Sequence, residues 1–195
     1  VEYVIGLMDY FGAEQAILVG NSAGGRVALS TAVQYPERVQ ALVLVDSSSG
    51  SGRSMTLTQL LYQLPKMRAI GPYAVRSIAS SGVDSIYAAW HDPSLVTEEI
   101  LEGYKLPLQV ENWDRALFEY QRASQRPEIT SQFDRLTMPV LVLSGDDDRT
   151  IPMEYAVKLS EQITGSELVI FENCGHLPHE ECNKAFMKTV GGFLS

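Results

Sequence analysis

The sequence predicts an α/β fold in which a mostly parallel sheet is flanked by helices. Two observations support this prediction: short, continuous apolar runs recur along the chain, and segments with helical periodicity separate them. Such runs are typical of parallel strands that are buried on both faces, and their alternation with helices predicts crossover connections within one sheet. The predicted strands cover residues 16–20, 41–46, 138–144 and 167–171.

The predicted helices follow from apolar spacing and from residues that end helices. Apolar side chains at positions 1, 4, 5 and 8 recur at the spacing of an amphipathic helix, and Gly12 marks its end. The next helix ends at Tyr35, because Pro36 cannot continue it. The further predicted helices cover residues 24–35, 113–125, 153–164 and 181–193.

The chain begins at Val1, inside the first helical pattern, rather than at a methionine. A domain rarely begins in the middle of a working helix. We therefore expect a preceding segment that this sequence does not contain.

Residues 47–113 interrupt the alternation of strands and helices. This stretch has a Ser/Gly-rich start and short helical pieces but no strong strand pattern, so we expect a helical lid inserted into a core of residues 1–46 and 114–195. Its apolar side chains favour an acyl or aromatic substrate. Trp90 and Trp113 are candidates for the walls of the substrate pocket, although large aromatic side chains are as often core residues.

Composition and charge exclude some classes of partner. The 195 residues include 24 acidic and 15 basic residues, which gives a formal net charge of -9. No basic stripe is present to neutralise phosphates, so nucleic acid is not an expected partner. No apolar run reaches the length of a membrane-spanning helix. The sequence does not identify the cellular compartment, and we favour the cytoplasm. The two cysteines, Cys174 and Cys182, do not make a disulfide framework, and we interpret them as reduced thiols.

The motif Gly-x-Ser-x-Gly occurs at residues 20–24, directly after a predicted strand and directly before a predicted helix. This is the context of a nucleophile elbow, a sharp turn whose strained backbone exposes the serine hydroxyl above the sheet. Glycines two positions either side of Ser22 let neighbouring chain pass close by. The sequence therefore predicts Ser22 as a nucleophile.

With this motif in this context, the chain resembles the α/β-hydrolase family, over essentially its whole length. Other branches of that family carry aspartate at the elbow, as in haloalkane dehalogenases and epoxide hydrolases, or cysteine, as in dienelactone hydrolases. Ser22 places the resemblance in the branch with a serine nucleophile.

The resemblance also implies the acid and the base, in the chain order serine, acid, histidine. Asp148 stands three residues after a glycine and shortly before an Ile-Pro pair, as the family's acid does, whereas Asp146 and Asp147 are interpreted as a solvated turn. His176 stands in a Gly-His loop followed by a proline and an acidic residue, as the family's base does. His179 is the competing candidate, and the spacing of the two histidines does not suit a zinc site.

Acyl transfer also needs donors for the oxyanion. The first expected donor is the backbone N–H of Ala23, the residue after the nucleophile. The family takes the second from a loop after an earlier strand, which this sequence lacks, so we expect weak catalysis at best from these residues alone. The strand over 16–20 would also lie at a bare edge of the sheet, where we expect a missing N-terminal segment or a second chain to cover it.

The resemblance implies a serine hydrolase that cleaves a carboxylic ester or a similar acyl bond through an acyl-enzyme, without a cofactor or metal. The alternatives are a carbon–carbon bond hydrolase, an acyltransferase or a lyase on the same fold, or a truncated, non-catalytic binding member. Asn21, beside the nucleophile, resembles the residue found there in hydrolases that cleave carbon–carbon bonds in ring-fission products. It is a third candidate for substrate binding, with Trp90 and Trp113.

Overall fold

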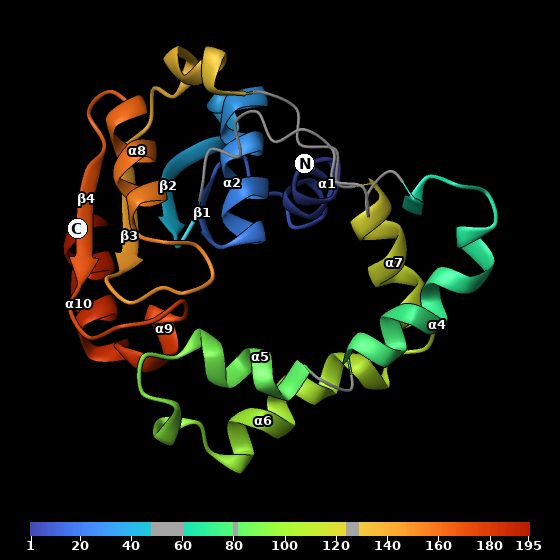
Figure 1. Cartoon of the computed structure of the whole chain (residues 1–195). Coiled ribbons are helices and arrows are strands. Elements are labelled where there is room, and N and C mark those ends of the chain that lie inside the picture. The colour runs from blue at the N-terminus through green and yellow to red at the C-terminus, as the bar shows by residue number, and fades with distance from the viewer. Residues whose placement is uncertain (48–60, 80–81, 124–128) are drawn as a thin grey trace. The chain divides into compact units, whose positions relative to one another are not determined.

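The computed structural model describes residues 1–47, 61–79, 82–123 and 129–195 (Figure 1). The chain divides into two compact units. The first comprises Val1–Ser51, Ala89–Asp92 and Glu128–Ser195, and the second comprises Gly52–Ala88 and Pro93–Pro127. The predicted lid boundaries at 47 and 113 stay a prediction, and each unit is described by itself.

The first unit is built on a four-stranded, fully parallel sheet, which confirms the predicted fold class. Its strands lie in the order of the chain, so that each strand pairs with its neighbours in sequence. The strands are β1 (Ala16–Asn21), β2 (Val39–Val45), β3 (Val140–Gly145) and β4 (Glu167–Phe171). Because all four run in the same direction, the loops that follow them gather at one edge, where the candidate site lies.

Helices connect the strands and cover both faces of this sheet (Figure 1). The short 3-10 turns of this unit are η1 (Pro36–Arg38) and η4 (Thr130–Arg135). Its α-helices are α1 (Glu2–Tyr10), α2 (Ala23–Gln34), α8 (Glu154–Gln162), α9 (Pro178–Glu181) and α10 (Asn183–Phe193). The helix predicted over 181–193 begins at Asn183 in the structure, after the separate short helix α9.

Alternation of side chains along the strands produces one apolar core on each face of the sheet. On one face, Leu42 and Leu44 of β2 pack with the cluster that includes side chains of α2 and α8. On the other face, Val43 and Val45 pack with a cluster that includes α10. All four side chains are almost completely buried, which explains why β2 reads as a continuous apolar run.

β1 lies at an edge of the described sheet and pairs only with β2 there. Its side chains Ile17 and Val19 are 40% and 53% exposed. Covering of this edge by a preceding segment or a second chain stays a prediction.

The second unit is helical in its described part. Gly71 of α4 (Met67–Ala79) lies against the ring of Phe118 of α7 (Trp113–Ala123), where a Cβ atom would overlap the ring. Arg76 also donates a hydrogen bond to Asp114 across the same helix pair, with a distance of 2.6 Å. The remaining elements of this unit are α5 (Gly82–Ala89), whose last residue belongs to the first unit, η2 (Pro93–Leu95), α6 (Glu98–Lys105) and η3 (Leu106–Gln109).

The interpretation of the two cysteines as reduced thiols is wrong, because the structure joins Cys174 and Cys182 in a disulfide. The loop after β4 turns back through α9, and this turn brings the two Cα atoms to 6.3 Å. Eight residues of sequence separation gave no sign of that approach. No helix in the described part of the chain combines the length and the apolar character that a membrane span requires.

Candidate active site

Ser22 occupies a strained turn between β1 and α2. Its backbone has φ 52° and ψ -117°, a conformation that residues other than glycine adopt rarely. Its N–H donates to the carbonyl of Val45 on the neighbouring strand, at 2.8 Å, which holds the turn against β2. At Gly20 a Cβ atom would lie 2.5 Å from the backbone of Gly24, so the turn can close only on a glycine.

Ala23 is the first residue of α2 and is exposed. The first N–H groups of a helix have no carbonyl acceptor within the helix, and they lie at the positive end of its dipole. The backbone N–H of Ala23 therefore has the electrostatic setting of an oxyanion donor, and its role as one stays a prediction.

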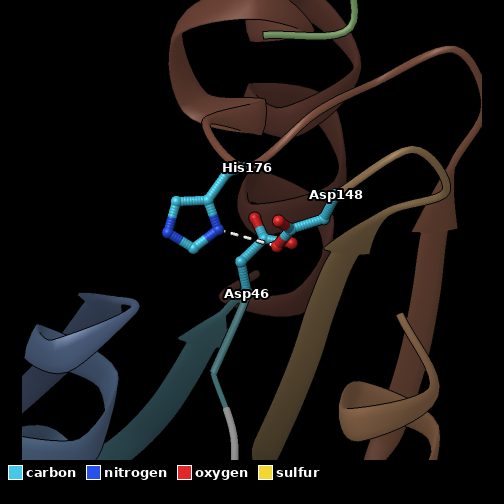
Figure 2. Close-up of side chains that lie close together, drawn as sticks. All are labelled: Asp46, Asp148 and His176. Carbon is cyan, nitrogen blue, oxygen red and sulfur yellow. Dashed lines mark hydrogen bonds and ion pairs between the residues drawn. The ribbon is translucent and has the colours of Figure 1, made fainter. Parts of the chain in front are cut away.

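Asp148 and His176 form a buried acid–base pair (Figure 2). His176 Nδ1 lies 2.7 Å from Asp148 Oδ2, and the two side chains are 9% and 0% exposed. The other oxygen, Oδ1, accepts hydrogen bonds from the backbone N–H groups of Thr150 and Ile151, at 2.7 and 2.8 Å. A carboxylate facing Nδ1 places the ring proton on that nitrogen and leaves Nε2 free to act as a base.

The backbone around His176 is held by groups from three other segments. The N–H of His176 donates to the carbonyl of Ala89 at 2.7 Å, and the N–H of Gly175 donates to Glu181 Oε2 at 2.7 Å. The side-chain amide of Asn21 donates to the His176 carbonyl at 3.1 Å. The residue beside Ser22 thus holds the histidine loop, and the contact between the Ser22 hydroxyl and the imidazole stays a prediction.

Asp46 is a third member of this cluster that the sequence analysis missed. It follows β2, has φ 45° and is completely buried. Its carboxylate Oδ1 accepts hydrogen bonds from the Ser144 hydroxyl and the Gly145 N–H, at 2.9 and 3.1 Å. Burial, followed by the nearby charge of Asp148, raises the pKa of Asp46 to about 8. An aspartate at the end of a buried strand was visible in the sequence, but nothing there indicated its neighbours.

Asp46, Asp148 and His176 are the described residues whose donor atoms could hold a metal ion, since one ligand atom from each lies within 4.8 Å of the others. Two carboxylates and an imidazole are a chemically reasonable ligand set. However, Asp148 already binds two N–H groups and the imidazole. This arrangement favours a hydrogen-bonded pair over a metal centre.

The other two aspartates of the loop have different partners. Asp146 is exposed and accepts a hydrogen bond from the N–H of Cys174 at 3.2 Å. Asp147 contacts Arg149 and His91 Nδ1, the latter at 2.9 Å, and hydrogen bonds from these two side chains lower its pKa. Neither carboxylate contacts the imidazole of His176 in the interactions of the described residues.

The candidate substrate-binding residues belong to different units of the chain. Trp90 belongs to the first unit and is 3% exposed, and its indole N–H is buried without a hydrogen-bond acceptor among the described residues. Trp113 begins α7 in the second unit and is half-buried. Substrate contacts of Asn21, Trp90 and Trp113 stay predictions. His179, the competing base, is half-buried, and its pKa is lowered by that burial.

Comparison with known proteins identifies the family. Residues 1–189 match the model of the alpha/beta hydrolase family. The chain is 31% identical over 192 residues to YugF, an uncharacterized hydrolase of Bacillus subtilis, covering 98% of this chain and 69% of the relative. It is 32% identical over 205 residues to a 2-hydroxy-6-oxo-2,4-heptadienoate hydrolase of Pseudomonas putida, covering 100% and 69%.

A solved structure shows the same likeness. The 2-hydroxy-6-oxo-6-phenylhexa-2,4-dienoate hydrolase of Rhodococcus sp. strain RHA1 superposes with a TM-score of 0.73 at 25% identity, over 98% of this chain and 68% of that protein. The chain thus spans about two thirds of the length of these proteins. The expected family resemblance is confirmed. The chain belongs to the alpha/beta hydrolase family and is an enzyme of the hydrolase type.

Proposed function

We propose that this chain is a serine hydrolase in which Ser22, His176 and Asp148 act as a catalytic triad. The observation that carries the proposal is the buried hydrogen bond between His176 Nδ1 and Asp148 Oδ2, at 2.7 Å. It stands beside a strained strand-to-helix turn that presents a serine. Asn21, the neighbour of that serine, hydrogen-bonds the histidine's own carbonyl, which supports a short path between the hydroxyl and the imidazole.

The chemistry follows from the roles of these groups. Ser22 Oγ attacks a substrate carbonyl carbon while His176 Nε2 takes the hydroxyl proton. The N–H of Ala23 stabilises the oxyanion. His176 then gives the proton to the leaving group as the bond to the carbonyl carbon breaks, and water hydrolyses the acyl-enzyme by the same steps in reverse order. Asp148 stabilises the imidazolium that forms between these steps.

Two leaving groups fit this sequence of steps. In ester hydrolysis the leaving group is an alcohol, which takes the proton on oxygen. In carbon–carbon bond hydrolysis the leaving group is a carbanion equivalent, which takes the proton on carbon. The names of several relatives favour the second class, since they are hydrolases of 2-hydroxy-6-oxo dienoates and of 2-hydroxymuconate semialdehyde. We propose a dienoate of this kind as the second candidate substrate, beside a carboxylic ester.

A fluorophosphonate probe, which reacts only with an activated serine, tests the triad. We expect labelling of the wild-type chain and none of Ser22→Ala. The matched control is Ser160→Ala, which removes a hydroxyl of α8 that hydrogen-bonds Ser166, and it should label normally. A wild-type chain that never labels would favour the non-catalytic binding member, and labelling retained in Ser22→Ala would exclude Ser22 as the nucleophile.

The substrate is then tested by comparing kcat/KM for p-nitrophenyl esters of increasing acyl length with kcat/KM for 2-hydroxy-6-oxo-6-phenylhexa-2,4-dienoate. A preference for the dienoate that disappears in Ser22→Ala would support carbon–carbon bond hydrolysis. Turnover of the esters alone would support the ester assignment.

A further inference from the structure

Asp46 lies beside the acid–base pair without a role in the mechanism above. Figure 2 shows its carboxyl group next to that of Asp148, on the side of the cluster formed by the end of β2. The side chain has no exposed surface, and its backbone adopts a left-handed conformation that aspartate rarely takes. A completely buried acid next to a second buried acid requires an explanation, because each isolated buried charge is costly.

The hydrogen bonds of Asp46 are distributed unequally between its two oxygens. Oδ1 accepts from the Ser144 hydroxyl and from the Gly145 N–H. Oδ2 is buried and accepts from no donor among the described residues. A deprotonated Oδ2 would therefore be an unsatisfied buried charge, whereas a protonated Oδ2 needs only an acceptor, and Asp148 supplies one.

Asp148 is better suited to carry the single negative charge of this pair. Its oxygens accept from the N–H groups of Thr150 and Ile151 and from His176 Nδ1. Two carboxyl groups side by side in a buried site resist ionising together because like charges repel, and one charge with one proton is the favoured state of such a pair. The larger number of donors keeps the charge on Asp148 and leaves the proton on Asp46.

We propose that Asp46 remains protonated at neutral pH and donates a hydrogen bond from Oδ2 to the carboxylate of Asp148, and that it is a positioning residue of the acid–base pair. This inference rests on the proposed function, because it gives Asp46 a role through Asp148 and His176. The neutral acid holds the Asp148 carboxylate in place for the imidazole. Because Asp46 is neutral, the two carboxyl groups together place only one negative charge beside the imidazole.

The direction of the pKa agrees with this assignment. Burial is the largest influence, and the charge of Asp148 adds to it, so that the pKa of Asp46 rises to about 8 in spite of the hydrogen bonds from Ser144 and Gly145. The titratable groups that face Asp46 in the described structure are Asp148 and His176. Neither provides a fixed positive charge that would stabilise an Asp46 anion.

Loss of this proton should weaken the catalytic base. The two carboxylates would repel each other and displace Asp148 from Nδ1 of His176. The imidazole would then lose the partner that fixes its tautomer and orientation. The rate of acylation should therefore fall as the pH rises through the pKa of Asp46.

The test uses Asp46→Asn, which keeps the shape, offers a carbonyl oxygen to Ser144 and Gly145, and offers an N–H to Asp148 at every pH. We expect its rate of fluorophosphonate labelling at pH 7 to stay close to that of the wild type, and its alkaline decline to move to higher pH or to disappear. Asp46→Ala should lose roughly 10- to 100-fold in that rate at pH 7, the effect of losing one hydrogen bond to a charged group. Asp134→Asn, at an exposed carboxylate, is the matched control and should change neither value.

A second measurement does not depend on activity. Infrared spectra of Ser22→Ala at pH 7 should contain the C=O band of a protonated carboxylic acid, and Ser22→Ala combined with Asp46→Asn should lack it. An unchanged alkaline decline in Asp46→Asn, or the absence of the band, would overturn the inference. Failure of the proposed function would look different, because the wild-type chain would then take up no probe at any pH.

Discussion

The two glycines of the Gly-x-Ser-x-Gly motif should respond in opposite ways to the same substitution. A Cβ atom at Gly20 would lie 2.5 Å from the carbonyl carbon and oxygen of Gly24 and 2.6 Å from the nitrogen of Gly25. These are backbone atoms in the first turn of α2, so relief requires the helix to move away from β1. At Gly24 itself, a Cβ atom would meet nothing within 4 Å.

The magnitudes follow from these surroundings. Overpacking costs about 1–3 kcal/mol, and we expect the upper end for Gly20→Ala because backbone cannot rotate aside. Removing a glycine from the unfolded chain returns about 0.4–1 kcal/mol, which leaves a net loss of about 2 kcal/mol. Gly24→Ala places alanine in a helix in open space and should stabilise the fold by up to about 1 kcal/mol.

The assay is urea unfolding of both variants followed by circular dichroism, with thermal unfolding as a second measurement. At this chain length, a change of 1 kcal/mol shifts the melting temperature by roughly 2–4 °C. Gly20→Ala should also label more slowly with the fluorophosphonate probe, because Ser22 lies between the strand and the displaced helix. Equal destabilisation of the two variants, or a fully stable Gly20→Ala, would refute the close approach on which this reasoning depends.

Three further predictions concern the charged and covalent parts of the site. Asp148→Asn should lower kcat by about 10⁴-fold, because an amide stabilises neither the required tautomer nor the imidazolium; a loss below tenfold in ester or dienoate turnover would contradict its role. The pKa of Asp46 is about 8 in the folded state and 3.8 in the unfolded state. The protonated group therefore contributes fully to the free energy of unfolding below about pH 4, and this contribution is lost as the pH rises to about 8. Urea unfolding between pH 5 and 7 should therefore show wild-type stability falling by up to about 1.4 kcal/mol per pH unit relative to Asp46→Asn, and parallel pH dependences would contradict it. Titration under denaturing conditions should find no free thiol before reduction, and Cys182→Ser should lower the free energy of unfolding by about 2–3 kcal/mol; two free thiols before reduction would exclude the disulfide.

The sequence by itself determined the fold class and the turn that carries Ser22, because both depend on local pattern. Continuous apolar runs such as Leu42 to Val45 need burial on both faces, and only a parallel sheet with helices on each side provides it for several strands. The strained turn is local as well, since Gly20 and Gly24 are within four residues of each other. Asp148 and His176 could be selected from the short motifs around them, and the structure places them 2.7 Å apart.

Only the tertiary structure decided which groups surround that pair. Asp46 and Asp148 are far apart in the sequence and meet because the ends of β2 and β3 are neighbours in the sheet. The contact of Asn21 with the His176 carbonyl, across 155 residues, and the pairing of Cys174 with Cys182 also depend on how loops fold back over one edge. Such contacts have no local pattern, because a polar or sulfur side chain in a loop can meet many partners, and the packing of the strands below it selects one.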